Sequence, residues 1–190
     1  YYALVPHEPW RLITCAFLHY GVLHFAFNAI ALFIVGKVLE VHYGWARLWT
    51  LYVAFAVVSS LASAGWNALL ATGSLPFGGS PAVSAGASGA VYGLILMGYV
   101  YARSQAHRLG SIAASLQSWI LIGVVFTFVF PGIDVAGHVG GAAAGAVAGA
   151  LVQPKPGKDA HPAWKPIAIG LAFLCLASFG MVVLALRAGR

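Results

Sequence analysis

The chain has 190 residues, of which 61% are hydrophobic and 7% are charged, and its formal net charge is +6 at pH 7. Average soluble domains carry about 25% charged residues, so a water-soluble globule built from this chain could not cover its surface with polar groups. We therefore exclude an ordinary cytosolic enzyme, a disordered chain and a nucleic-acid-binding protein, and we predict an integral membrane protein that is mostly helical.

Six apolar stretches are long enough to cross a bilayer core, which takes about 20 residues in a helix. In chain order we predict them at 22–39, 46–64, 85–102, 112–130, 135–152 and 167–186. Transmembrane β-strands would instead show short runs that alternate between apolar and polar residues. The predicted fold class is therefore all-α, a polytopic bundle of transmembrane helices with six visible spans.

The positive charges predict which ends of the spans face the cytoplasm, because Lys and Arg concentrate in cytoplasmic loops. Seven of the 10 basic residues lie around the loops after the first, third and fifth spans: Lys37, Arg47, Arg103, Arg108, Lys155, Lys158 and Lys165. The others are Arg11, Arg187 and Arg190. Segment 1–21, the loop at 72–81 and the turn at 131–134 are then expected to face outward. The short loops favour the inner membrane of a bacterium, and an organelle membrane is the alternative.

Three groups of polar residues lie at the outward ends of the predicted spans, where a polar group is costly and needs a reason. His24 and Asn28 are four residues apart, so they share one face of the first helix. Ser88 and Tyr92 have the same spacing at the start of the third span, and His138 lies at the start of the fifth. These five residues are the candidates for a site.

A repeat of glycines indicates how two of these groups can meet. The fifth span carries a glycine every four residues, at Gly137, Gly141, Gly145 and Gly149, and the third span offers Gly89 and Gly93. Small residues at this spacing let two helix backbones approach closely. Packing of these two helices would bring Ser88 and His138 within hydrogen-bond reach.

Covalent hydrolysis needs a nucleophile such as a serine hydroxyl next to a general base that can take its proton. The residues alone leave a second interpretation equally open. In it, Ser88 bonds to its own helix backbone, while His24 and His138 hydrogen-bond between helices without any catalytic role.

The motifs, taken together and in order, resemble the rhomboid intramembrane serine proteases along nearly the whole chain. The matching segments are Trp10-Arg11 in the first outer loop, His24-Phe25-Ala26-Phe27-Asn28 as HxxxN, Gly36 and Glu40 at the end of that helix, Gly86-Ala87-Ser88-Gly89 as GxSG, and Gly137-His138-Val139-Gly140-Gly141.

By this resemblance Ser88 would be the nucleophile and His138 the general base. The oxyanion hole would consist of His24, Asn28 and the backbone N–H of Ser88. Tyr92 would support the site by packing on the His138 ring. Trp10 and Arg11 would hold the outer loop at the lipid interface. The other supporting residues would be the glycines Gly86, Gly89 and Gly141.

The implied activity is that of an intramembrane serine endopeptidase that cleaves transmembrane segments of other membrane proteins near the outer face, through an acyl-enzyme. The partners would be these substrates and the lipid bilayer. We expect no cofactor, no metal and no nucleic acid.

The resemblance also divides the chain into four parts. These are an outer-loop segment at 1–21, the core helices at 22–152, a cytoplasmic linker at 153–166 and an additional C-terminal transmembrane helix at 167–190. The family core begins with a helix before the Trp-Arg loop, and we expect that first core helix to be missing from this chain. The loop at 72–87 is expected to cover Ser88 and to act as a gate.

Asp134 lies four residues before His138 and admits two roles. It could orient the imidazole as a third catalytic residue, or it could cap the helix that follows Pro131-Gly132. We predict the cap, because Asp is favoured at this position and because the family works with a Ser–His pair.

Two other functions stand as alternatives. A catalytically inactive relative would bind membrane proteins and escort them, but such relatives typically lack the serine or the histidine, and both are present here. A small transporter would line a polar path with His24, Asn28 and His138. The chain shows no inverted repeat and no acidic residue deep in a span to support it.

Overall fold

The computed structural model describes residues 7–74, 85–130, 132–152, 154 and 162–188, and the regular structure within these residues is helical throughout. Two short helices, α1 (Arg11–Thr14) and η1 (Cys15–Phe17), come first. They are followed by α2 (Val22–Tyr43), α3 (Trp45–Ala71), α4 (Ser88–Ser104), α5 (Ala106–Val129), α6 (Val135–Leu151) and α7 (Trp164–Arg187). Each predicted span coincides with one of the helices α2 to α7, which confirms the predicted all-α bundle.

The helices differ in length. Within the described ranges, α2, α3, α5 and α7 are long and apolar enough to cross a membrane. By contrast, α4 and α6 have 17 residues each, or about 26 Å of helix. The third span was predicted from residue 85, but α4 begins at Ser88. The reason is Gly86, whose φ of +130° lies outside the helical region.

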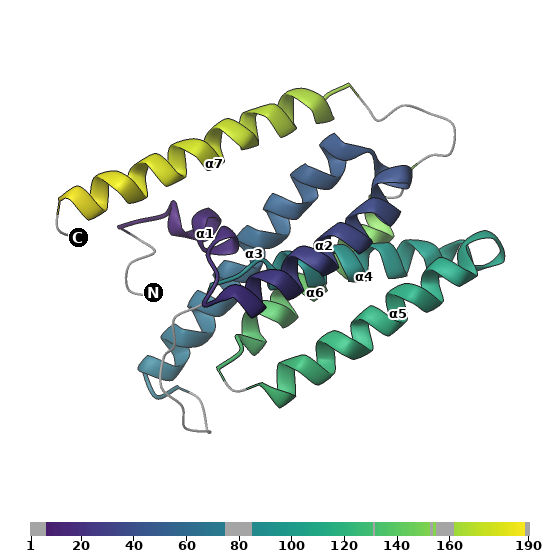
Figure 1. The fold of residues 1–190 in the computed structure, drawn as a ribbon, viewed down its shortest axis with the longest axis horizontal. Helices are drawn as coiled ribbons and strands as arrows, with labels where there is room; N and C mark the ends of the chain where they lie inside the picture. The colour runs from purple at the N-terminus through teal and green to yellow at the C-terminus, as the bar shows by residue number, and fades with distance from the viewer. Residues whose placement is uncertain (1–6, 75–84, 131, 153, 155–161, 189–190) are drawn as a thin grey trace.

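The short helix α4 lies at the centre of the bundle. Its residues Leu94, Met97 and Ala102 are at most 1% exposed, and it packs against α2, α3, α5 and α6. Figure 1 shows α5 and α7 on opposite sides of this central group, with α7 in contact with α3 and α1. The surroundings of α4 are therefore largely protein, and a helix in such surroundings need not match the thickness of a bilayer.

Glycines bring α4 and α6 into backbone contact. A Cβ atom added at Gly141 would overlap the carbonyl group of Gly89, and one added at Gly145 would overlap that of Gly93. One turn further, Gly149 lies against Met97. Any larger residue would push the helices apart, so the predicted close approach along the glycine stripe is confirmed.

The segment before α2 is held against the core by hydrogen bonds. The backbone N–H of Gly86 donates to the carbonyl oxygen of Cys15 at 2.8 Å, and Cys15 Sγ lies 2.9 Å from Ser60 Oγ of α3. Arg11 forms an ion pair with Glu8. The two contacts of Cys15 fix the short helices next to α3 and the start of α4.

Candidate active site

Ser88 and His138 meet at the ends of the two glycine-packed helices. Ser88 is the first residue of α4, and His138 lies in the first turn of α6. The distance between Ser88 Oγ and His138 Nε2 is 2.7 Å, a hydrogen bond. Fifty positions separate the two residues in the chain, so the tight packing of α4 on α6 is what makes them neighbours.

The His138 imidazole is held on its other sides by Tyr92 and Thr127. The rings of Tyr92 and His138 are stacked, with centroids 4.4 Å apart and planes inclined by 28°. Thr127 Oγ1 of α5 lies 2.9 Å from His138 Nδ1 and 2.7 Å from the Tyr92 hydroxyl. His138 itself is 8% exposed, so its orientation is set by protein groups.

The contact of Thr127 with His138 was not among the sequence predictions. Thr127 is the lone hydroxyl-bearing residue in the apolar run 120–130. A buried polar group in a membrane span needs a reason, and that rule applied to this run would have drawn attention to it. Its partner could not be inferred, because the rotation of α5 against α4 and α6 is not encoded in any local pattern.

Asp134 caps α6, as predicted. Its Oδ1 accepts a hydrogen bond of 2.9 Å from the backbone N–H of Gly137, which satisfies one of the N–H groups that a helix leaves open at its start. The Nδ1 atom of His138 is bound by Thr127 instead. The position where a third triad residue would act is thus held by a neutral hydroxyl.

His24 and Asn28 lie beside the segment that leads into Ser88. A Cβ atom added at Gly86 would come within 2.7 Å of His24 Cε1, so the ring rests on the Gly86 backbone. Asn28 is 7% exposed, and its Nδ2 donates to the His24 carbonyl at 2.9 Å. Since a side-chain amide has two N–H donors, the second is available to another acceptor.

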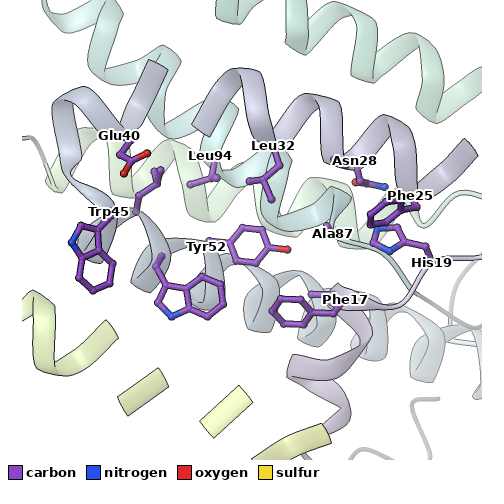
Figure 2. Close-up of a pocket in the computed structure, with 14 residues that line it drawn as sticks. Phe17, His19, Phe25, Asn28, Leu32, Glu40, Trp45, Tyr52, Ala87 and Leu94 are labelled. Carbon is purple, nitrogen blue, oxygen red and sulfur yellow. The ribbon is translucent and has the colours of Figure 1, made fainter. Parts of the chain in front are cut away.

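A cavity of about 360 Å³ opens next to these residues, between α2, α3 and η1. Figure 2 shows Asn28, His19 and Ala87 at one end and Glu40 and Trp45 at the other. The lining is otherwise mostly aromatic and aliphatic. The cavity therefore reaches the candidate oxyanion residue Asn28 and the residue that precedes Ser88.

His19 lies at the polar end of this cavity. Its ring contacts that of His24 edge-on, with centroids 5.1 Å apart, and its Nε2 is buried without a hydrogen-bond partner in the part of the chain that the structure describes. Burial lowers the pKa of the His19 imidazole, while a hydrogen bond with the Phe17 backbone raises it less. The neutral form is thereby favoured at pH 7.

Trp10 and Arg11 lie at the start of α1. Arg11 pairs with Glu8, and the Trp10 indole nitrogen is buried. Gly89 lies against Ser59 of α3, where an added Cβ would overlap the serine side chain. Gly89 thus lies in the packing beside Ser88, whereas Trp10 and Arg11 belong to the segment of α1, which packs on α3 and α7. The loop expected to cover Ser88 falls largely in 75–84, outside the described residues.

Comparison with known proteins identifies the family. Residues 6–155 match the family model for the rhomboid domain. The chain is 37% identical over 172 residues to the rhomboid protease GluP of Bacillus subtilis (strain 168), covering 88% of this chain and 31% of that protein. It is 29% identical over 154 residues to the rhomboid protease AarA of Providencia stuartii, covering 70% of this chain and 52% of that protein.

A plant relative gives the same result. The chain is 31% identical over 137 residues to RHOMBOID-like protein 1 of Arabidopsis thaliana, covering 71% of this chain and 32% of that protein. The chain thus spans between about a third and about half the length of these three relatives. Because the family model matches well over half of its residues, this chain belongs to the rhomboid family.

Proposed function

We propose that this protein is an intramembrane serine endopeptidase in which Ser88 and His138 act as a catalytic pair. The observation that carries the proposal is the 2.7 Å contact between Ser88 Oγ and His138 Nε2. A serine hydroxyl is a weak nucleophile until an adjacent base takes its proton, and this geometry supplies the base. Bacterial relatives from the same family are named rhomboid proteases.

The reaction follows from this pair in two halves. Ser88 Oγ attacks the scissile carbonyl carbon while His138 Nε2 takes the hydroxyl proton, which gives a tetrahedral intermediate. The C–N bond then breaks as His138 delivers that proton to the leaving amine, and an acyl-enzyme remains. In the second half, a water molecule attacks the acyl carbon while His138 Nε2 takes its proton. The bond from the acyl carbon to Ser88 Oγ then breaks as His138 returns that proton to Oγ, which releases the acid product and restores the Ser88 hydroxyl.

The negative charge of each tetrahedral intermediate needs hydrogen-bond donors that are already in place. We assign this role to His24, to the side-chain N–H of Asn28 that does not bond to the His24 carbonyl, and to the backbone N–H of Ser88. All three are neutral donors, so none leaves an unpaired charge inside the protein. The start of α4 adds the positive end of a helix dipole at the nucleophile.

Gly86→Ala tests the oxyanion assignment. A side chain at φ +130° is strained, at a cost of about 1–3 kcal/mol, and the new Cβ would push the His24 ring from its place on the backbone. Since losing one oxyanion donor costs about 10²–10³ in rate, we expect a fall of that order in kcat. The measurement is the cleavage rate of a transmembrane reporter by the purified variant.

The control for this variant is Gly65→Ala in α3, where an added Cβ meets nothing within 4 Å. It should keep the wild-type rate and thermal stability. Full activity of the Gly86→Ala protein would show that the position of His24 does not matter to the reaction, and the assignment of His24 would be dropped.

The proposed substrate is a transmembrane segment of another membrane protein. A helical segment hides its carbonyls in backbone hydrogen bonds, so Gly, Pro or polar residues near the cut should ease its entry into the site. The charge distribution supports cleavage near the outer face, because seven of the 10 basic residues belong to the loops expected on the cytoplasmic side, and Ser88 begins α4 at the opposite end. Short loops favour the inner membrane of a bacterium.

We also propose the four-part organisation of the chain. Segment 1–21 would support the site from outside, residues 22–152 would form the core, 153–166 would link on the cytoplasmic side, and 167–190 would add a helix. The packing of α7 on α3 and α1 supports the last assignment, because it places that helix beside the core and away from α5.

The test is cleavage of a fluorescent transmembrane reporter by the full chain in proteoliposomes, with the product ends determined by mass spectrometry. We expect cleavage by the wild type and none by Ser88→Ala. A matched control is Ser118→Ala, since Ser118 Oγ bonds to the Ala114 carbonyl on an exposed face of α5. The proposal is overturned if Ser88→Ala cleaves the reporter as fast as the wild type. It is also overturned if the wild type and Ser88→Ala bind the reporter equally and both leave it intact.

A further inference from the structure

We propose that Thr127 is a positioning residue that selects the tautomer of His138, with the proton on Nδ1 and the lone pair of Nε2 facing Ser88. The inference rests on the proposed function, because it explains why His138 can act as a base. It concerns a contact of α5 with the Ser–His pair that the sequence motifs do not indicate.

The hydrogen bonds around Thr127 Oγ1 limit how protons can be arranged. This oxygen lies 2.9 Å from the Gly123 carbonyl, 2.9 Å from His138 Nδ1 and 2.7 Å from the Tyr92 hydroxyl. A hydroxyl has one proton and two lone pairs. Because a carbonyl can only accept, the Thr127 proton goes to Gly123, and the two lone pairs remain for donors.

The two remaining partners then have to donate. Tyr92 donates its hydroxyl proton to Thr127, and His138 donates from Nδ1–H. A neutral imidazole has one N–H, so Nε2 is left as an acceptor that can take the Ser88 proton. In the other tautomer, Thr127 would have to donate to Nδ1 and lose its bond to Gly123, so that two hydrogen bonds replace three.

The loss of one hydrogen bond matters here because both residues are buried. Thr127 is 9% exposed and His138 is 8% exposed, and hydrogen bonds are strong where water is excluded. When His138 becomes an imidazolium during the reaction, the Nδ1–H bond to Thr127 becomes charge-assisted and strengthens. A neutral threonine thus does part of what a triad carboxylate does, without a buried charge.

Gly123 makes room for the arrangement one turn before Thr127 in α5. A Cβ atom added there would lie 2.6 Å from the Tyr92 hydroxyl oxygen. With glycine, the phenol can reach Thr127 while its ring stays stacked on His138. Tyr92 therefore fixes both the plane of the imidazole and the direction of the threonine proton.

The test compares Thr127→Val, which keeps the shape of the side chain and removes the hydroxyl, with Thr127→Ser, which keeps the hydroxyl. We expect Thr127→Val to lower kcat about 10- to 100-fold, the loss seen when a metal-bound histidine loses its orienting partner, with KM changed little. Thr127→Ser should retain most of the rate. The control is Thr50→Val, because Thr50 makes the same bond to its own helix, to the Ala46 carbonyl at 2.8 Å, away from the site.

A second readout does not depend on activity. In protein with ¹⁵N-labelled histidine, the chemical shifts show which ring nitrogen carries the proton, and the His138 signals are those that vanish in His138→Ala. We expect a protonated Nδ1 in the wild type and in Ser88→Ala, and a larger share of protonated Nε2 in Thr127→Val.

The two readouts separate the inference from the proposed function. The inference that Thr127 selects the tautomer fails if His138 carries its proton on Nε2 in the wild type. It also fails if Thr127→Val has the kcat and the tautomer of the wild type. Should the wild type cleave no reporter while the tautomer still depends on Thr127, the inference about His138 holds and the proposed protease function fails.

Discussion

Replacing His138 with alanine is expected to lower the rate of reporter cleavage by about 10⁴- to 10⁶-fold, and replacing Ser88 should cost as much. The two side chains act as a unit, because a hydroxyl without a base is a poor nucleophile and a base without a nucleophile has nothing to activate. The double variant should therefore be no slower than either single variant. Single-turnover cleavage rates at equal protein density in proteoliposomes give this comparison.

A control for the His138 variant is His107→Ala. His107 is exposed on α5 and far along that helix from Thr127, so its loss should leave the rate unchanged. Thermal unfolding of each variant shows whether the fold survives. Losses that multiply in the double variant, or a His138→Ala protein that cleaves at the wild-type rate, would mean that Ser88 and His138 do not work together.

Replacing Gly145 with alanine is expected to destabilise the protein by about 3 kcal/mol or more, the upper range for an overpacked core. The added methyl group would overlap the Gly93 carbonyl, and a backbone carbonyl in a helix cannot rotate away as a side chain can. The helices α4 and α6 must separate to accept it. The measurement is the free energy of unfolding in detergent micelles.

The matched control is Gly180→Ala in α7, where an added Cβ has open space. That substitution should be neutral or slightly stabilising, because alanine favours the helix more than glycine does. Cleavage should fall in Gly145→Ala as well, since the same packing holds His138 next to Ser88. Equal stability of the two variants would mean that α4 and α6 do not depend on glycine contact.

Much of the fold could be predicted from the sequence, because its main signals are local. Runs of apolar residues locate the helices, and glycines four apart predict that α4 and α6 touch along Gly141 and Gly145. From that contact, the positions of Ser88 and His138 follow, and they lie within hydrogen-bond distance. The cap at Asp134 is also a local pattern, and it too could be predicted.

Other features depend on how helices rotate and tilt, which local patterns do not reveal. The bond from Thr127 to His138 requires α5 to turn its hydroxyl toward α6. The start of α4 at Ser88 depends on the conformation of Gly86, which hydropathy does not detect. The cavity beside His19 combines side chains from α2, α3 and η1, so it exists only in the assembled bundle.

Covalent labelling with a fluorophosphonate, followed by peptide mapping, tests whether Ser88 is a nucleophile activated by His138. Such a probe bonds to a serine oxygen only when a neighbouring base activates it, and no substrate needs to be known. We predict a single adduct on the peptide that contains Ser88, lost in Ser88→Ala and in His138→Ala. An adduct elsewhere, or labelling of Ser88 that persists without His138, would mean that His138 does not activate Ser88 as the nucleophile.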